Sequence, residues 1–231
     1  MISATTLTPL FAAVLICWIL SVCVHEFAHA LVAYLGGDKS VVAKGYLHFN
    51  IFAYIHPVTS ILLPALFLFM GGVPLPGGAV YIDDRALRGP AWRSAVSAAG
   101  PAANFILFLI LAAIVHPATG IVDSTSFVQP PWVMLLCTLT VLQVFAVLFN
   151  LLPIPPLDGF GIIEPYLPRE IRERARSFGW MGLVLLYVVL FHSNVAMGHF
   201  QDMITSVLTR FGLPFENTWR HYNLVFFGTS D

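Results

Sequence analysis

The sequence has few charged residues and few cysteines, and each shortage excludes a class of protein. Asp, Glu, Lys and Arg make up 10% of the 231 residues, with 11 basic and 12 acidic side chains and a formal net charge of −1. Nucleic-acid binding needs a concentrated basic face, so we expect no nucleic-acid partner. The three cysteines, Cys17, Cys23 and Cys137, all lie in apolar segments. They are therefore expected to be small buried hydrophobic residues and not a disulfide framework.

Apolar sequence is what the chain has in abundance. Hydrophobic residues account for 58% of the chain and the mean hydropathy is +0.83, which is more apolar than a soluble globular domain can carry on its surface. A helix needs roughly 20 apolar residues to cross a bilayer. Candidate runs lie near 7–35, 55–70, 95–116, 132–152 and 179–197, and four of them are long enough. The sequence therefore predicts an all-α polytopic membrane protein with about 4–6 transmembrane helices.

The basic residues between these runs predict the orientation. Lys or Arg follows the first run, precedes the third and follows the fourth, whereas 117–131 has neither. The positive-inside rule then places 117–131 and the N-terminus outside. The run 54–70 has basic flanks on both sides and a Gly/Pro-rich stretch after it, so we expect a re-entrant element or short β-hairpin between the first and second core spans. Extended edges at 41–49 and 78–82 could receive an unwound substrate peptide by strand addition.

The most specific motif is His25-Glu26-Phe27-Ala28-His29, which lies inside the first apolar run. On a helix, two histidines four residues apart share a face and can bind one metal ion, with the glutamate placed to act as a general base. Chance alone is a weak explanation for so specific a pattern. His25 and His29 are therefore candidate metal ligands, and Glu26 is the candidate catalytic residue.

A second polar site follows the fourth run, in the segment 150–159, which reads Asn-Leu-Leu-Pro-Ile-Pro-Pro-Leu-Asp-Gly. Its prolines break the helix, and an ionisable group beside such a break near hydrocarbon is costly without a partner. Catalytic zinc takes three protein ligands and keeps one position open, so the two histidines leave one ligand to find. Asp158 is the best-placed carboxylate. The alternative is that Asp158 and Gly159 simply form a turn.

Three motifs together resemble the site-2 protease family of intramembrane zinc metalloproteases. They are the His25–His29 segment, Ala99-Gly100-Pro101-Ala102-Ala103-Asn104, and the segment 150–159 with its Leu-Asp-Gly ending. The resemblance covers residues 15–165 and implies one Zn²⁺ per chain, bound by His25, His29 and Asp158. It also implies that Glu26 is the catalytic acid/base and that Asn104 and Asn150 help to hold the substrate. For Gly100, Pro101 and Asn104, a helix start followed by a helix-packing contact is an open alternative.

The chain also departs from the family pattern. Ile51, Tyr54 and His56 stand where many bacterial members have Pro, His and Asp, so no role is carried over to that loop. We expect residues 1–165 to form the membrane-embedded catalytic core. Residues 166–231 are expected to hold an interfacial helix, an additional transmembrane helix and a C-terminal tail, with no PDZ or CBS domain. Glu164 is either a supporting group near the metal or an interfacial charge.

The resemblance implies a hydrolase that cleaves peptide bonds within or next to transmembrane segments of membrane-protein substrates, in regulated intramembrane proteolysis. It implies a multi-pass protein of the cell membrane, the inner membrane in a bacterium, with its active site toward the cytoplasm. A homo-oligomer or a regulatory membrane partner is compatible with the sequence. Two other classes stay open: a transporter or channel that uses intramembrane His and Asp groups as a cation path, and a catalytically silent scaffold. The presence of all four core residues argues against the scaffold.

Overall fold

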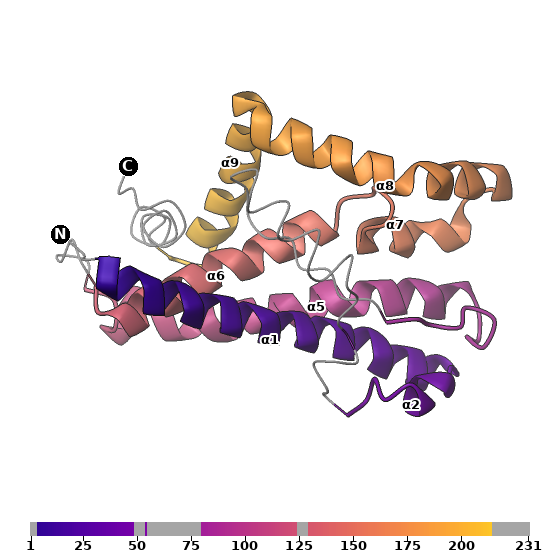
Figure 1. Cartoon of the computed structure of the whole chain (residues 1–231), viewed down its shortest axis with the longest axis horizontal. Helices are drawn as coiled ribbons and strands as arrows, with labels where there is room; N and C mark the ends of the chain where they lie inside the picture. Colours follow the sequence, from indigo (N-terminus) through magenta and orange to yellow (C-terminus); the bar gives the residue numbers. More distant parts are fainter. Residues whose placement is uncertain (1–3, 49–53, 55–79, 124–128, 214–231) are drawn as a thin grey trace. The chain divides into compact units, whose positions relative to one another are not determined.

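The computed structural model describes residues 4–48, 54, 80–123 and 129–213, and within these ranges the chain is all-helical, without a strand. The long helices (Figure 1) are α1 (Ala4–Gly36), α5 (Pro90–Val115), α6 (Pro131–Asn150), α8 (Arg169–His192) and α9 (Asn194–Arg210). The short elements are α2 (Ser40–Ala43), η2 (Pro117–Thr119), α7 (Asp158–Ile163) and η3 (Glu164–Tyr166). The expected all-α class is confirmed.

Three of the described helices are long and apolar enough to cross a membrane: Pro9–Gly36 of α1, α5 and α6. The shortest, α6, has 20 residues, and at about 1.5 Å per residue it matches a hydrocarbon core of about 30 Å. A fourth span is present if Met181–Leu190 and Asn194–Arg210, which are bent by 86°, count as one. The described part of the chain thus has three to four candidate spans. The expected re-entrant run and its Gly/Pro-rich stretch lie outside the described residues.

The segment that follows α1 turns back, and its described residues 41–48 do not form the extended edge that we expected at 41–49. Residues 41–43 belong to α2, and the amide of Tyr46 then donates to Val41 O over 3.1 Å. Gly45 has a φ of +78°, a left-handed conformation that glycine adopts without steric cost. Of the second expected edge, residues 80–82 have no regular secondary structure and 78–79 lie outside the described ranges.

Prolines stand where the apolar helices start and end. Pro90 and Pro131 are the first residues of α5 and α6, positions where the missing N–H costs little because first-turn amides have no partner within the helix. The helix α6 ends at Asn150, three residues before Pro153. The three prolines beyond it prevent the helix from continuing. The chain can therefore turn and begin α7 at Asp158.

Two compact units divide the chain, and the division falls within the long helices. Unit 1 consists of 1–19, 104–148 and 198–231, and unit 2 of 20–103 and 149–197. In unit 1, aromatic rings pack edge to face: the centroid of Phe108 is 5.0 Å from that of Phe211, just after α9, and the centroids of Phe145 and Phe200 are 5.2 Å apart.

In unit 2, the end of α1 and the start of α5 are tied together. The backbone amide of Arg88 donates to Gly36 O over 3.0 Å, and the Arg88 guanidinium lies 4.7 Å from the centroid of the Trp92 ring. The core of this unit contains Tyr54, whose hydroxyl donates to Tyr46 O over 2.6 Å. Its buried members are Cys23, Ala30, Ala33, Val41, Tyr46, Tyr54, Leu87 and Val96. Tyr54, which departs from the family pattern, is thus a packing residue here.

The three cysteines are free, and their environments bear out the prediction for two of them. Cys23 and Cys137 are buried, while Cys17 is partly buried. None of them forms a disulfide, which agrees with their apolar sequence context.

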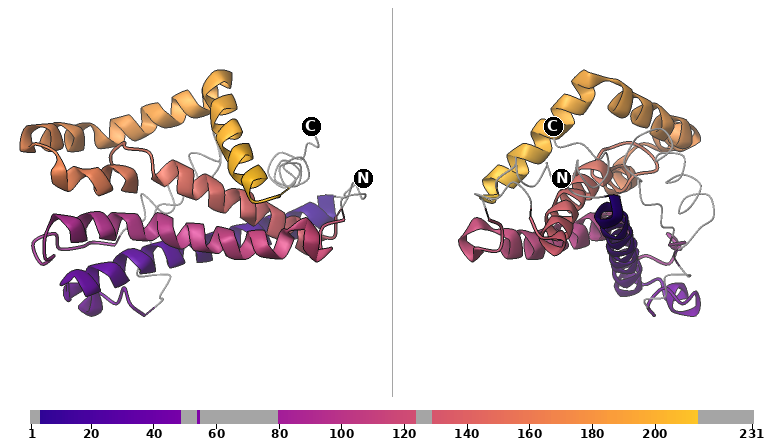
Figure 2. Two further views of the ribbon diagram at one scale, coloured as in Figure 1. Left: turned by 180° about the vertical axis from the view of Figure 1, so that it is seen from behind. Right: turned by 60° about the vertical axis from the view of Figure 1, so that its left-hand side comes forward.

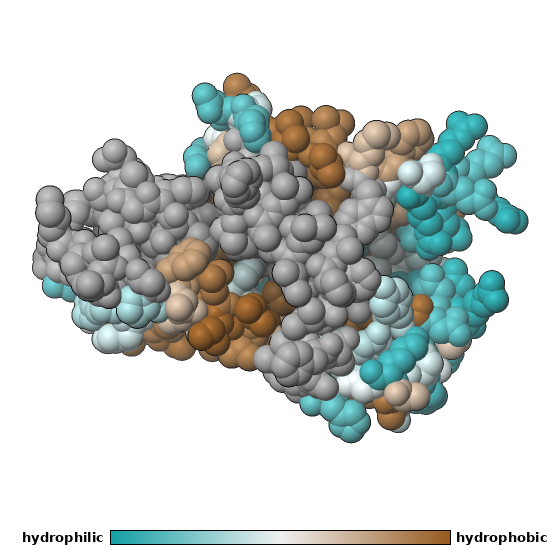
Figure 3. Space-filling view, viewed as in Figure 1, coloured by the Kyte–Doolittle hydropathy of each residue, from teal (hydrophilic) through white to brown (hydrophobic). Residues whose placement is uncertain are grey.

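Hydrophilic side chains of unit 2 gather at one end, over the starts of α5 and α8 and over α2 (Figure 3). Figure 2 shows from two further sides that the first half of α8 runs beside α7 at this end. Every Lys and Arg of the chain except Arg210 and Arg220 belongs to unit 2. They are Lys39, Lys44, Arg85, Arg88, Arg93, Arg169, Arg172, Arg174 and Arg176.

Candidate metal centre

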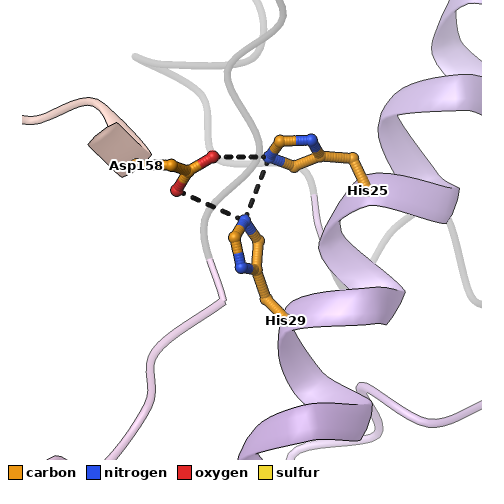
Figure 4. Close-up of side chains that lie close together, drawn as sticks. All are labelled: His25, His29 and Asp158. Carbon is orange, nitrogen blue, oxygen red and sulfur yellow. Dashed lines mark hydrogen bonds and ion pairs between the residues drawn. The ribbon is translucent and has the colours of Figure 1, made fainter. Parts of the chain in front are cut away.

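The side chains of His25, His29 and Asp158 meet in unit 2 (Figure 4). The two Nε2 atoms of the histidines are 3.0 Å apart, and the Asp158 oxygens lie 3.1 Å from His25 Nε2 and 3.4 Å from His29 Nε2. Around a tetrahedral zinc ion with bonds of about 2.0–2.1 Å, neighbouring ligand atoms are about 3.3 Å apart. The three side chains, which we call the metal group, are therefore spaced as the ligands of one metal ion would be.

Helix α1 places two members of the metal group and the candidate catalytic residue on one side. His25 and His29 are one turn apart, and their rings meet edge to face with centroids 4.6 Å apart. At about 100° per residue, Glu26 is offset from His29 by only about 60° around the helix axis. Glu26 is buried, with 7% of its surface exposed. The HExxH spacing thus predicted the arrangement that the helix produces.

Helix α5 fixes the orientation of the His29 ring. His29 Nδ1 lies 2.7 Å from the backbone carbonyl oxygen of Val96. Since a carbonyl can only accept, Nδ1 carries the hydrogen and the Nε2 lone pair is directed toward the metal group. Sequence reasoning missed this partner because a backbone carbonyl leaves no signal in the residue type.

The turn between α6 and α7 delivers Asp158 to the two histidines. Within it the amides of Leu152, Ile154 and Leu157 each donate to a carbonyl two or three residues earlier, over 2.8–3.1 Å. The prolines between them have no N–H group, so these three amides are backbone donors of the turn that find acceptors close by in the chain. Asp158 is the first residue of α7, and the Ser94 hydroxyl of α5 donates to Ile162 O over 2.6 Å. Asp158, which belongs to the metal group, is therefore carried by a helix that is tied to α5.

The chemistry of the group fits zinc. Asp158 Oδ2 is buried and has no hydrogen-bond donor among the described residues, although His25 Nε2 lies close to it. A buried acceptor without a donor is costly, and a cation would offset that cost. Metal binding needs an ionised carboxylate and neutral imidazoles, the states in which these side chains act as ligands. Two imidazole nitrogens and one carboxylate are ligands that catalytic zinc sites use.

The remaining predicted residues lie in different places. Asn150, the last residue of α6, precedes the turn to Asp158 and belongs to unit 2. Asn104 is buried in unit 1, where its Nδ2 donates to Gln143 Oε1 over 2.6 Å. Sequence reasoning missed Gln143, and the available signal was a glutamine in the middle of an apolar run.

Glu164 pairs with a basic residue of α8. Its carboxylate forms an ion pair with the Arg176 guanidinium, whose Nη2 is also 3.8 Å from an Asp84 oxygen. The hydrogen bond to Glu164 raises the pKa of Arg176 above its ordinary value. Glu164 thus links η3 to α8, and it is not one of the metal group.

A helical protein with several candidate membrane spans, two histidines and an aspartate in metal-binding geometry, and a glutamate between the histidines has the features of a membrane metalloprotease. The model of peptidase family M50, the site-2 protease family, matches residues 13–128. The chain belongs to this family and is a zinc metalloprotease. The matched range contains His25, Glu26, His29 and Asn104, whereas Asp158 lies beyond it.

Similar bacterial proteins carry names that agree with this class. The zinc metalloprotease named Rip2 of Mycolicibacterium smegmatis is 38% identical over 199 residues, which cover 81% of this chain and 73% of that protein. Rip2 of Mycobacterium tuberculosis strain H37Rv is 36% identical, covering 84% of this chain and 72% of the relative. The zinc metalloprotease named YwhC of Bacillus subtilis is 31% identical, covering 86% and 90%. No solved structure matches the chain.

Proposed function

We propose that this protein is an intramembrane zinc metalloendopeptidase that hydrolyses peptide bonds within or next to transmembrane segments of membrane-protein substrates, in regulated intramembrane proteolysis. The observation that supports this most directly is the position of the metal group. Two of its three members lie on α1, a helix that is apolar and long enough to span a bilayer. A peptidase centre on such a helix is within reach of a substrate that is itself in the membrane.

In this proposal His25, His29 and Asp158 hold one zinc ion per chain. When bound, zinc supplies Lewis-acid polarisation of the scissile carbonyl and of the attacking water. Glu26 accepts a proton from that water and returns it to the leaving amide nitrogen, so one carboxylate serves as general base and then as general acid. His29 keeps its Nδ1–H on Val96 throughout, which holds its ring in place. The reaction needs no covalent enzyme intermediate.

The substrate must be unwound for this reaction, because a helical peptide hides its carbonyls in i to i−4 hydrogen bonds. Asn150 stands at the end of α6, where the helix breaks before Asp158. We assign Asn150 and Asn104 the task of holding the extended substrate segment through their amide groups. The proposed catalytic core is 1–165, with a re-entrant element or hairpin before α5, about 4–6 spans in all, and 166–231 as an interfacial helix, a further span and a tail.

The distribution of basic residues supports a proposed orientation. The Lys and Arg residues of unit 2 lie next to α2, around the start of α5 and in the first half of α8, where hydrophilic side chains gather at one end of the unit (Figure 3). Cytoplasmic segments of membrane proteins are enriched in these residues. We therefore place this end, and the opening of the active site, on the cytoplasmic side of the cell membrane. A homo-oligomer or a regulatory membrane partner is compatible with this placement.

Zinc content measured in detergent-purified protein tests the proposal without knowledge of the substrate. About one zinc per chain is expected in the wild type, and Asp158→Ala should lose it, because three ligands are the minimum for a catalytic site. A folded wild-type protein without zinc, or zinc that survives the loss of Asp158, would contradict the proposed ligand set. Cleavage of a single-span substrate by Glu26→Gln at the wild-type rate would favour a transporter or a scaffold instead.

A further inference from the structure

Helix α5 passes close to the metal group at Gly100. An ideal Cβ atom built on Gly100 would lie 2.5 Å from Cε1 of His25 and still closer to the Nε2 atoms of both histidines. Carbon atoms in contact prefer separations of about 3.5–4.0 Å. A methyl group at residue 100 would therefore stand on the side of the two rings from which their Nε2 lone pairs must reach a metal ion.

The backbone itself gives no reason for glycine at this position. Gly100 is inside α5 with no left-handed φ, and alanine is the better helix former. Other helical glycines lack this constraint: a Cβ on Gly182 would meet its nearest atom at 3.6 Å, and one on Gly198 would meet nothing within 4 Å. Among the described glycines, Gly100 is the one whose missing side chain faces the metal group.

Gly100 acts on the same ring that Val96 orients. The two residues are four apart on α5, so they lie one turn apart on the same helix face. The Val96 carbonyl accepts a hydrogen bond from His29 Nδ1 over 2.7 Å. One turn further along α5, Gly100 has no side chain to occupy the space beside His29 Nε2. One face of α5 thus fixes the imidazole at one nitrogen and leaves room at the other.

We propose that Gly100 is a positioning residue for zinc, because the absence of its side chain creates the space in which the ion lies between His25, His29 and Asp158. This inference rests on the proposed metal centre and extends it to a third helix. With alanine at residue 100, the imidazoles must rotate away from the metal group or His29 must give up its hydrogen bond to Val96. Either change moves the Nε2 atoms out of the 3.0 Å arrangement that they share.

The test is zinc affinity, measured by chelator competition on the wild type, Gly100→Ala and Gly198→Ala. The last variant is the matched control, since it makes the same substitution in a helix at a site where a Cβ meets nothing. Gly100→Ala is expected to lose at least about 10-fold in zinc affinity, the scale on which neighbours of metal ligands act, while Gly198→Ala stays at the wild-type value. The visible absorption of the Co²⁺-loaded proteins should change in intensity or position only for Gly100→Ala.

Each outcome decides between the alternatives. Wild-type zinc affinity in Gly100→Ala would overturn the role of Gly100 and leave the proposed metal centre standing. Absence of zinc from the folded wild type would instead overturn the metal centre itself, together with this inference. The two failures are therefore distinguishable from the wild-type and variant samples alone.

A second variant covers the case in which Gly100→Ala does not fold. The same substitution is then made in a His25→Ala/His29→Ala background, where the rings that a methyl group would contact are absent. Folding there, with an unfolding temperature at or above that of the background, would support the proposal. Failure to fold in both backgrounds would mean that Gly100 serves helix packing, and the proposal would be wrong.

Discussion

His29 Nδ1 and the carbonyl oxygen of Val96 are 2.7 Å apart, and this hydrogen bond joins two helices across 67 residues of sequence. It makes the geometry of the metal group depend on α5 as well as on α1, because the ring that donates to Val96 presents its other nitrogen to His25 and Asp158. A buried ring held at one nitrogen has few other rotamers available.

Asp158→Asn should weaken zinc binding while preserving the shape of the site. The amide keeps one oxygen but removes the negative charge that lies 3.1 Å and 3.4 Å from the two histidines. Because anionic ligands contribute much of the affinity for a divalent cation, a loss of about 10–100-fold or more is expected. Chelator competition measures it, with Asp202→Asn on the exposed face of α9 as the control. Equal affinity in the two variants would remove Asp158 from the ligand set.

Glu26→Gln should separate zinc binding from catalysis. Glutamine retains the size of the buried side chain but cannot accept and return a proton, so cleavage of a single-span substrate should fall by about 10²–10⁴-fold. Zinc content should stay at the wild-type level, because Glu26 is not a member of the metal group. Loss of zinc in this variant would show that Glu26 is needed to hold the ion, contrary to its proposed role.

Gln143→Leu should destabilise the helix pair α5 and α6 and, if Asn104 holds the substrate, raise KM. The substitution removes the acceptor at 2.6 Å from Asn104 Nδ2, and both side chains are buried. Polar pairs between membrane helices contribute about 0.6–2 kcal/mol, which detergent unfolding can measure.

Thr140→Val is the control for this variant. Thr140 is also buried in α6, but its hydroxyl donates to Leu136 O within the same helix, so its replacement breaks that hydrogen bond and leaves the one between Asn104 and Gln143 in place. Equal destabilisation by the two variants would show that Gln143 acts only as a space-filling residue.

Asp38→Asn should destabilise the protein in a manner that depends on pH. Asp38 is fully buried and accepts hydrogen bonds from the amides of Ser40 and Asp83 over 2.9 Å and 2.8 Å. Burial would raise the pKa of the Asp38 carboxyl, but the Ser40 and Asp83 hydrogen bonds lower it overall. Since the folded pKa lies below the unfolded value of about 3.9, the stability from this carboxylate is complete above that pH.

The expected effect is about 1–3 kcal/mol at neutral pH, typical of hydrogen bonds to a charged group. It should shrink as the pH falls through the folded pKa of Asp38, where the wild type also loses the charge. Unfolding of both proteins at neutral pH and near pH 3 measures the difference. A difference that stays constant between the two pH values would assign the effect to packing.

The features that depend on neighbouring residues in the chain could be predicted from the sequence, whereas those that depend on distant contacts could not. The spacing of His25 and His29 is a property of one helix, and the helix break before Asp158 follows from its prolines, so both could be read from residue type and position. The role of the Val96 carbonyl could not, because it requires knowing which turn of α5 faces α1.

Gly100 was missed for the same reason, because it resembles helix punctuation until its distance to the histidines is known. The edge expected at 41–49 was a different kind of miss, since Asp38 and Gly45 promote a turn in the described part of that segment. Local patterns report a residue's own conformation, whereas the choice of neighbour is made by tertiary packing.

The members of the metal group are far apart in the sequence, with two histidines at positions 25 and 29 and an aspartate at position 158. A zinc ion held there would therefore cross-link the chain and close the long loop between His29 and Asp158. Removal of the ion would increase the conformational entropy of that loop. Chelation should then loosen the turn 151–157 before any helix melts. Susceptibility of that turn to limited proteolysis, with and without chelator, would report how strongly the ion couples α7 to α1.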